Sequence, residues 1–450
     1  MDEAALERLA GRTGEPLARL REWQERGLIR GDDDAVADAE RVRLIRFLLG
    51  RGFDVELIAR ANAEQDGLLD RALTLLYPWS PLPEHSLDEV AATARIDSSV
   101  AQRLLTAAGL SDRTDGASED DVQALGVLAA ALDAGLPEPA ILQLVRVYVD
   151  SLQRVAEAEV RLVHFYFHER LRAEGLSEPE LTGATRDLSD QLQAAVEPTV
   201  LYFHRKGWTT AVRDDIALHV AQAADDSEAS KVPGQLMAAV VFTDLARYTP
   251  LTEAMGDAAA AEVIERFSDI VRTATSACQG RVVKQIGDEF MLVFYEPRAA
   301  VECALAIDER ATEESNFPAV RSGAHWGEVL YREGDYFGAT VNIAARLGAQ
   351  AAAHELVVTS TVAKAAGPFP DAEIVSMGRR KLKGLSEEPE LCMIRSSRHG
   401  PSGRLVDPVC GMGMPADQVV ARLEIGGELR AFCSNECLER FVAAPDRYGP

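Results

Sequence analysis

The sequence predicts a multidomain chain with an all-α amino-terminal region, an α+β domain and a small carboxy-terminal module. Apolar residues recur at three- and four-residue spacing through residues 1–230, as on the buried faces of helices. Strand and helix patterns then alternate over residues 235–396, which is typical of a sheet with helices packed on it. Three of the six cysteines lie close to the end of the sequence, and this grouping indicates a local site rather than a disulfide framework.

Length and composition exclude several classes of protein. The chain has 450 residues, of which 26% are charged, and this is long enough for about two to four domains with their own cores. No apolar run approaches the roughly 20 residues of a membrane span, and residues 1–5 lack the features of a signal peptide. We therefore expect a cytoplasmic protein without a membrane partner. The formal charge of −25 argues against a general role on nucleic acid, because Lys and Arg drive phosphate binding.

An internal repeat divides the helical region. Residues 6–10 align with residues 87–91, and further on six positions match at an offset of about 83 residues. The matched positions are Val42, Leu44, Leu49, Gly52, Phe53 and Ile58 with Leu125, Val127, Leu132, Gly135, Leu136 and Ile141. We predict two helical copies, at residues 1–75 and 76–150, followed by a helical dimer stalk and a polar linker over residues 151–230.

The first helical copy resembles the helix-turn-helix domain of MerR-type regulators, with residues 21–29 where that family reads its operator. Two interpretations remain open, a DNA-binding regulator and a helical scaffold reused for packing or sensing. The scaffold is favoured because residues 32–34 are all Asp and the first lysine of the sequence is Lys206, whereas a DNA reader needs positive charge. A nucleic-acid partner is therefore disfavoured.

Two acidic residues stand at strand ends in the α+β segment. Residues 237–244 form a buried-strand run that ends in Asp244. Residues 282–294 are two apolar runs broken by a Gly-Asp pair, which is a strong hairpin signal and leaves the Asp288 carboxylate at the tip. Two such carboxylates could hold a pair of divalent cations, as phosphoryl-transfer sites require.

Further motifs resemble the catalytic domain of class III nucleotidyl cyclases over the whole of residues 235–396. The motifs are residues 242–245, Lys284 with residues 287–289, residues 334–338, residues 341–346 and residues 382–385. The resemblance implies a ferredoxin-like sheet with helices, and a homodimer with its active sites at the interface. In each such site one protomer supplies the metal carboxylates, and the other supplies the residues that read the base, ribose and phosphate. It also implies that the helical region before the domain is regulatory.

The resemblance assigns roles to individual residues. Asp244 and Asp288 hold two Mg²⁺ or Mn²⁺ ions, while the backbone amides just after Asp244 face the phosphates. Asn342 orients the ribose and Arg346 stabilises charge on the α-phosphate; at a spacing of four residues they share one helix face. Lys383 either meets the triphosphate or belongs to a structural turn.

By the same resemblance, Lys284 and Asp335 read the base. Lys can donate to adenine N1 and Asp can accept from the N6 amine, whereas guanine presents the opposite pattern there. The pair therefore predicts an adenylate cyclase that converts ATP into 3′,5′-cyclic AMP and pyrophosphate. The alternatives are a DNA-binding or metal-sensing regulator with a cyclase-like nucleotide-binding domain.

The end of the chain, residues 405–450, resembles a YHS domain, a small module associated with metal binding. The resemblance rests on residues 407–412, residues 432–437, Phe441 and residues 445–448. Cys433 and Cys437 share one face if a helix begins at Ser434, and Cys410 comes from a preceding turn.

Three such thiolates suit Zn²⁺ or Cu⁺, with Met412, water or a partner group as a fourth ligand. The alternative is that Cys410, Cys433 and Cys437 are buried packing residues. It is disfavoured because a module of about 45 residues builds a core with difficulty unless it has a metal or a partner.

Overall fold

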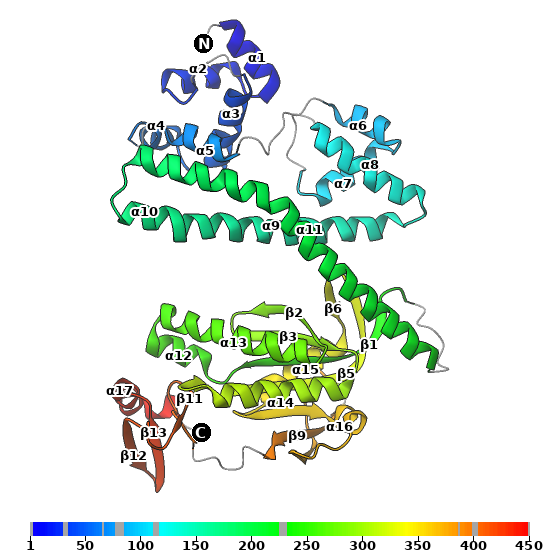
Figure 1. Cartoon of the computed structure of the whole chain (residues 1–450), viewed down its shortest axis with the longest axis vertical. Coiled ribbons are helices and arrows are strands. Elements are labelled where there is room, and N and C mark those ends of the chain that lie inside the picture. The colour runs from blue at the N-terminus through cyan, green and yellow to red at the C-terminus, as the bar shows by residue number, and fades with distance from the viewer. Residues whose placement is uncertain are drawn as a thin grey trace. The chain divides into compact units, whose positions relative to one another are not determined.

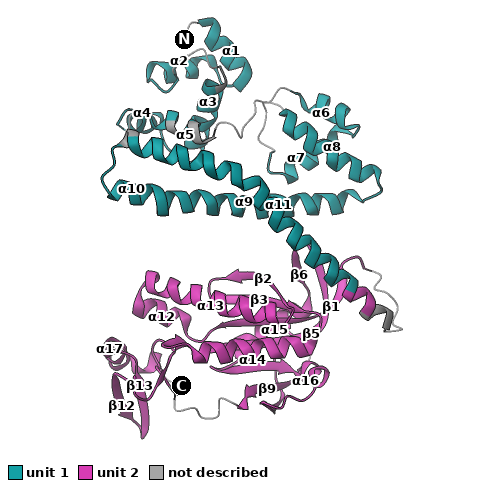
Figure 2. Ribbon diagram, in the orientation of Figure 1, with its two compact units in different colours: residues 1–216 teal, residues 217–450 magenta. Residues whose placement is uncertain are grey.

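The structure of the chain, a computed structural model, describes residues 3–29, 35–64, 67–76, 85–110, 117–224, 232–385, 388–397 and 404–448. It contains two compact units, residues 1–216 and 217–450 (Figure 2). The predicted fold class is confirmed, because a helical region precedes a mixed α/β domain. The acidic run at residues 32–34 and most of the predicted linker at residues 223–230 lie outside the described residues. Among the helices described, none is both long and apolar enough to span a membrane.

The first unit opens with two groups of short helices (Figure 1). The first group is α1 (Glu3–Thr13), α2 (Leu17–Glu25), α3 (Ala35–Gly50), α4 (Val55–Glu64) and α5 (Leu68–Leu76). The second group is α6 (Leu87–Ala94), α7 (Ser98–Ala107) and α8 (Glu119–Asp133), with the first turns of α9 (Glu138–Leu162). Each group has its own buried core, the first around Trp23 and the second around Leu104.

Two of the six aligned pairs lie in the cores of the two groups, whereas Phe53, Val127 and Leu136 of the other pairs are exposed. Val42 and Ile58 are buried in the first group, and Leu125 and Ile141 are buried in the second. The capping residues also support the helix starts of the second group. Ser86 accepts a hydrogen bond from the amide of Glu89, so α6 begins with a capping box. The division of the region at residues 75 and 76 stays a prediction.

A long helical hairpin completes the first unit. Helix α9 passes through a π-helical turn, η1 (Val163–His168), into α10 (Glu169–Ala173), and the chain returns along α11 (Glu178–Ala224). The rings of Tyr148 in α9 and His204 in α11 stack at 6.4 Å, so the two helices lie side by side. Tyr202, Phe203 and Trp208 are exposed on α11. These exposed rings suit the predicted role of a dimer stalk.

The second unit is built on an eight-stranded sheet of order β2-β3-β1-β5-β7-β9-β8, with β6 paired to β5. The strands are β1 (Gln235–Leu245), β2 (Arg281–Ile286), β3 (Glu289–Phe294), β5 (Val320–Arg332), β6 (Asp335–Phe337), β7 (Glu355–Thr359), β8 (Ala372–Arg379) and β9 (Glu390–Ser396). The helices are α12 (Tyr248–Met255), α13 (Asp257–Ala277), α14 (Pro297–Glu313), α15 (Ala339–Gln350) and α16 (Ser360–Ala366).

The alternation of side chains along β1 separates the two faces of this sheet. Ala239 and Val241 pack in the core under α13 and α14, whereas Val240 and Phe242 pack on the other face with Ala344 of α15. Asp244 is two residues after Phe242, and its side chain therefore lies on the same face of the sheet as α15. The Asp244 carboxylate thus lies at the end of β1, beyond Phe242, the last apolar residue of the strand on that face.

The carboxy-terminal module belongs to the second unit and packs on its sheet domain. It contains β10 (Arg404–Val406), β11 (Met412–Pro415), β12 (Ala421–Ile425), β13 (Glu428–Phe432), α17 (Asn435–Ala443) and the short η3 (Pro445–Arg447). Strand β11 pairs with β4 (Phe317–Pro318), which lies directly before β5. Phe432, Phe441 and Tyr448 of the module are buried in one continuous core with Phe317. The module therefore shares its core with the sheet domain.

Candidate active site and thiol cluster

The structure brings Asp244 and Asp288 to one place. Strand β1 ends one residue after Asp244, and Gly287 takes a φ of +63° in the turn between β2 and β3. The amide of Leu245 donates a hydrogen bond to Oδ2 of Asp288 at 3.3 Å. The end of β1 is therefore joined to the tip of the predicted hairpin.

Arg321 is a member of this site that the sequence did not indicate. It lies opposite Asp244 in the β1–β5 register. Its Nε donates to Oδ1 of Asp244 at 2.5 Å and its Nη2 donates to Oδ2 at 2.9 Å. Such a two-point contact matches the fork of a guanidinium to a carboxylate. The contact depends on the pairing of distant strands, for which the local sequence carries no signal.

The carboxylates of the site have raised pKa values. Burial is the main cause at Asp244, where it outweighs the opposing hydrogen bonds from Arg321. Burial also raises the pKa of Asp288, and the charge of Asp244 raises it further. The pKa of Glu289 is raised by burial and by the charges of Asp244 and Asp288. Three carboxylates and one guanidinium leave two negative charges in excess, and oxygen donors in this state suit divalent cations.

Lys284 and Asp335, predicted to read the base, form an ion pair. Nζ of Lys284 donates to Oδ2 of Asp335 at 2.5 Å, while Oδ1 of Asp335 accepts from the amide of Tyr336 at 2.8 Å. The register of β2 against β3 shifts between Val282 and Lys284. Such an irregularity re-aims the side chains that follow it.

Asn342 and Arg346 lie one turn apart on α15, as the spacing predicted. Asn342 is exposed and Arg346 is half-buried. The Arg346 guanidinium lies against the turn of residues 382–385, since a Cβ added at Gly384 would be 3.3 Å from its Nη2. Lys383 is exposed in that same turn. Both interpretations of Lys383 therefore stay open, but it neighbours a predicted phosphate ligand.

The predicted residues thus fall into three local groups: Asp244 with Asp288, Lys284 with Asp335, and Arg346 beside Lys383 and Asn342. How they meet around one nucleotide stays a prediction, because the resemblance divides them between two protomers.

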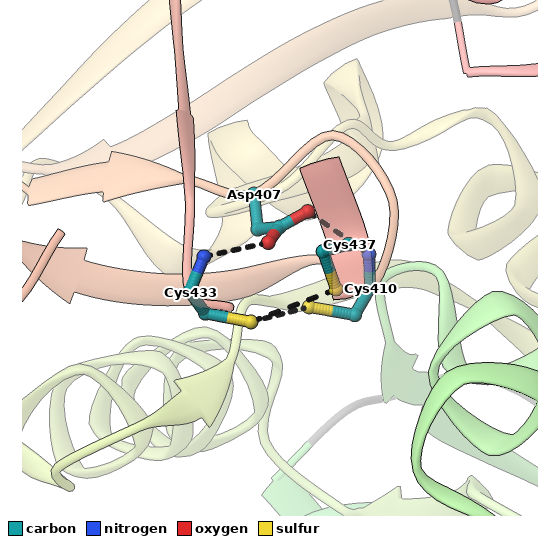
Figure 3. Close-up of side chains that lie close together, drawn as sticks. All are labelled: Asp407, Cys410, Cys433 and Cys437. Atoms are coloured by element: carbon teal, nitrogen blue, oxygen red, sulfur yellow. Dashed lines mark hydrogen bonds between the residues drawn. The ribbon is translucent and has the colours of Figure 1, made fainter. Parts of the chain in front are cut away.

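The three tail cysteines converge with a fourth residue, Asp407 (Figure 3). The ligand atoms of the four side chains all lie within 4.8 Å of one another. Sγ of Cys433 is 3.4 Å from that of Cys410 and 3.7 Å from that of Cys437. Sulfur ligands about 2.3 Å from a tetrahedral cation lie about 3.8 Å apart, so these separations fit a thiolate metal site. We call these four residues the thiol cluster.

Local structure explains how the cluster forms. Ser434 caps α17 and its hydroxyl accepts from the amide of Cys437 at 3.1 Å, so Cys433 and Cys437 flank the start of the helix. Asp407 is fully buried and accepts three backbone hydrogen bonds. Its Oδ1 accepts from the amides of Val409 (2.8 Å) and Cys410 (3.3 Å), and its Oδ2 accepts from that of Cys433 (2.8 Å). An Asp that closes a turn in this way forms an Asx turn, and the Asp407-Pro408 pair is a sequence signal for it.

The thiols affect one another. The pKa of Cys437 is lowered because the thiols of Cys410 and Cys433 donate hydrogen bonds to it. The pKa of Cys410 is raised, chiefly by its hydrogen bond with Cys433. A cation bound by the three sulfurs would take the place of their protons.

Comparison with known proteins identifies residues 235–395 of the second unit as a nucleotidyl cyclase catalytic domain. The family model described as "Adenylate and Guanylate cyclase catalytic domain" matches residues 235–395. The model described as "Adenylate cyclase regulatory domain" matches residues 22–203.

Curated relatives extend over both regions. An adenylate cyclase of Streptomyces coelicolor is 31% identical, over 61% of this chain and 70% of its own length. A pH-sensitive adenylate cyclase of Mycobacterium tuberculosis is 26% identical, over 84% of this chain and 94% of its own. The crystal structure of the adenylyl cyclase CyaB from P. aeruginosa covers 37% of this chain and 96% of its own, with 18% identity and a TM-score of 0.33.

The chain belongs to the class III adenylate cyclase family and carries its regulatory and catalytic domains. The predicted family is confirmed. The MerR-like and YHS resemblances stay predictions.

Proposed function

We propose that the protein is an adenylate cyclase that converts ATP into 3′,5′-cyclic AMP and pyrophosphate, at sites completed across a homodimer. The observation that supports this most is the meeting of Asp244 and Asp288 at the end of β1, in a chain of this family. The ion pair of Lys284 and Asp335 supports ATP as the substrate.

Asp244 and Asp288 are the residues that would hold two Mg²⁺ or Mn²⁺ ions. When bound, such ions activate the ribose 3′-hydroxyl and offset the charge of the triphosphate. Arg321 supplies the counter-charge that holds Asp244 in place. Its contact uses one acceptor site on each oxygen of Asp244, so each oxygen keeps a second site that can face a cation.

The base is read by hydrogen-bond polarity. The ammonium of Lys284 has three N–H donors, so it can keep Asp335 and still donate to adenine N1. The carboxylate of Asp335 has acceptor sites left for the N6 amine after its bonds to Lys284 and Tyr336. Guanine would set donor against donor and acceptor against acceptor at these two residues.

Asn342 acts on the ribose and Arg346 acts on the α-phosphate, from one face of α15. Of the amides after Asp244, that of Leu245 donates to Asp288 and that of Ala246 donates to the carbonyl of Ala319 at 2.7 Å. The amides at the start of α12 are therefore the ones left to face the phosphates.

Exposed apolar side chains beside the site support a dimer. Ile286, two residues before Asp288, is 65% exposed, and Phe337, two residues after Asp335, is 49% exposed. Large apolar groups next to functional residues are typical of a surface that a partner covers. We infer that a second copy of the chain covers them.

Complementation of two inactive variants tests the dimer. Asp244→Ala removes a metal carboxylate and Arg346→Ala removes a phosphate ligand. An equal mixture should recover about a quarter of the wild-type activity, because half of the dimers pair the two variants and each of those holds one complete site. Failure to recover activity, with both variants dimeric by size-exclusion chromatography, would overturn the shared site.

The activity itself is tested with purified protein, ATP or GTP, and Mn²⁺ or Mg²⁺. We expect cyclic AMP and pyrophosphate in equal amounts, and far less product from GTP. Consumption of ATP to ADP without a cyclic product would contradict the proposal.

We also infer that the helical region regulates the catalytic domain, in keeping with its match to a regulatory domain. A dimeric hairpin of α9 and α11 would set how two catalytic domains meet, and an interfacial site is sensitive to small rotations. A chain that starts at Val232 should differ several-fold in activity from the full chain. Equal kinetics in a truncated dimer would contradict this role.

DNA binding is less well supported. Arginines in the segment that resembles an operator reader are paired within the chain: Arg21 with Glu3, and Arg26 with Glu22 and Glu56. Arg19, just before the segment, pairs with Glu15. Guanidinium groups already paired with carboxylates offer less charge to phosphates. We therefore retain the scaffold interpretation for residues 1–75.

A cytoplasmic location of the protein stays a prediction.

The thiol cluster is proposed as a second metal site, for Zn²⁺ or Cu⁺. Thiolates select these soft or borderline cations over Mg²⁺ and Mn²⁺. Asp407 adds an oxygen to the three sulfurs, although its three backbone hydrogen bonds also give it a positioning role. Full-length protein should contain about one such cation per chain by elemental analysis.

A further inference from the structure

We propose that the thiol cluster controls the cyclase, because it holds a turn that clamps the residues directly after Asp244. Binding of a thiophilic cation by the cluster then changes the catalytic rate or the affinity for ATP. This inference rests on the proposed cyclase activity for one of its readouts, but the clamp itself is measurable without turnover.

One short turn belongs to both sites. Residues 407–411 carry Asp407 and Cys410 of the cluster, and the amide of Gly411 donates back to the carbonyl of Asp407 at 2.9 Å. The Asp407 carboxylate closes the same turn through the amides of Val409 and Cys410. Any change in the position of Cys410 therefore moves this turn as a whole.

The other side of the turn touches the catalytic chain. Nη1 of Arg247 donates to the carbonyl of Pro408 at 2.5 Å. Gly411 takes a φ of +75°, and a Cβ at this position would lie 2.5 Å from the carbonyl oxygen of Ala246. The backbone of the module thus lies directly against residues 246 and 247, between Asp244 and α12.

Arg247 is held in an uncommon conformation at this point. Its φ of 66° and ψ of 34° are left-handed, which is unfavourable for a residue with a side chain, and it is the residue before the first turn of α12. The bond from Arg247 to Pro408 is a contact that helps to hold it there. The start of α12, which is proposed to face the phosphates, therefore depends on the module.

The module also reaches the strand that carries Arg321. Strand β11 pairs with β4, and the carbonyl of Ala319, which lies between β4 and β5, accepts from the amide of Ala246. Arg447 at the end of the module pairs with Glu253 of α12, at 2.7 and 3.0 Å. The module therefore contacts the chain directly after β1, which carries Asp244, and directly before β5, which carries Arg321.

A cation would stiffen this arrangement. Without one, the three sulfurs are joined only by weak S–H hydrogen bonds. Metal–sulfur bonds would tie the 407–411 turn to the end of β13 and the start of α17. Since the turn contacts Arg247 and the η3 segment directly after α17 carries the Arg447 contact to Glu253, loading should hold residues 246–253 more firmly.

The first experiment compares full-length wild type with Cys433→Ser/Cys437→Ser and with the control Cys278→Ser, a half-buried cysteine outside the cluster. Zn²⁺ content, kcat and the KM for ATP are measured at a fixed Mn²⁺ concentration, before and after treatment with a chelator that is selective for Zn²⁺ over Mn²⁺. We expect about one Zn²⁺ per chain in wild type and control. We expect a several-fold change in kcat/KM on chelation of these two, and no response from the double variant.

The second experiment tests the contact. Glu253→Arg places like charges opposite Arg447, while adding Arg447→Glu restores an ion pair of reversed polarity. We expect the single variant to keep its Zn²⁺ and to lose most of the response to chelation. The reversed pair should regain it.

A third measurement does not depend on turnover. Hydrogen exchange of the amides in residues 245–255 should slow on Zn²⁺ loading of wild type and stay unchanged in the cysteine double variant. Slower exchange without any cyclic product would leave the clamp standing and refute the cyclase assignment. Bound Zn²⁺ with unchanged exchange and unchanged kinetics would overturn the inference, as would a metal-free cluster with a Cys410–Cys433 disulfide found by mass spectrometry of alkylated protein.

Discussion

The second unit contains two candidate cation sites that are built on opposite principles. The Asp244–Asp288 site uses carboxylates at a strand end and a hairpin tip, and its counter-charge is the side chain of Arg321. The thiol cluster is largely buried, and its carboxylate is held by three backbone amides. A guanidinium on a long side chain can turn away, whereas backbone amides cannot.

The difference indicates how each site uses its cation. Oxygen donors with excess charge bind Mg²⁺ or Mn²⁺ loosely enough for the ions to enter and leave with nucleotide and pyrophosphate. Converging thiolates bind a soft cation tightly and suit a resident one. We therefore expect the two sites to respond to different metals, different chelators and different substitutions.

The largest expected effect is the loss of catalysis on removal of Asp288. Asp288→Ala should lower cyclic AMP formation by on the order of 1,000-fold, because it removes a ligand of both cations. Asp407→Ala should lose zinc but keep measurable turnover, which separates the two sites. Asp269→Asn, an exposed Asp on α13, is the matched control and should be unaffected. Full activity of a dimeric Asp288→Ala protein would refute the catalytic assignment.

Several parts of this comparison could be predicted from the sequence because they are encoded locally. The Gly287-Asp288 turn, the strand that ends at Asp244 and the helix start beside Cys433 each follow from a few adjacent residues. The arrangement around them could not. Arg321 is 77 residues from Asp244, and Pro408 is 161 residues from Arg247.

Such contacts depend on which distant strands pair, and in which register, and a single strand carries no such information. Asp407 was missed for another reason. The cysteines alone indicate a metal site, whereas an Asp before a Pro indicates only a turn that a carboxylate closes.

A smaller effect is expected at the base. Lys284→Glu with Asp335→Cys reverses the hydrogen-bond polarity, so kcat/KM for ATP should fall by about 100-fold and GTP should become a substrate. The double variant should keep the zinc content of wild type, because neither residue belongs to the thiol cluster. An unchanged preference for ATP would show that Lys284 and Asp335 do not read the base.

The next effect concerns stability and separates the metals. Removal of Zn²⁺ or Cu⁺ from wild type should lower the midpoint of thermal unfolding by several degrees, on the order of 2–4 °C, because the module shares the core around Phe317. Mg²⁺ and Mn²⁺ should not restore it. Cys433→Ser/Cys437→Ser should unfold at the lower temperature with or without Zn²⁺. Restoration by Mg²⁺ would mean that the cluster does not distinguish soft from hard cations.

The smallest expected effect comes from neutralising one carboxylate in each site, with chelators present. Burial raises the folded-state pKa of Asp288 above the ordinary value of 3.8. The folded chain therefore binds the proton more tightly than the unfolded chain does, and this contribution to stability is present below pH 3.8 and lost as the pH rises through the folded-state pKa. Asp288→Asn, which cannot ionise, should raise the unfolding midpoint at pH 7 by on the order of 1–2 °C and have little effect at pH 4.

Burial also raises the pKa of Asp407, so titration alone would predict the same gain from Asp407→Asn. The opposite is expected, because three amides donate to this carboxylate and a side-chain NH₂ in place of one oxygen would face donors. Differential scanning calorimetry of both variants at pH 7 and pH 4 measures the contrast. A stabilised Asp407→Asn protein would mean that the backbone amides do not hold this residue, and the two carboxylates would then be alike.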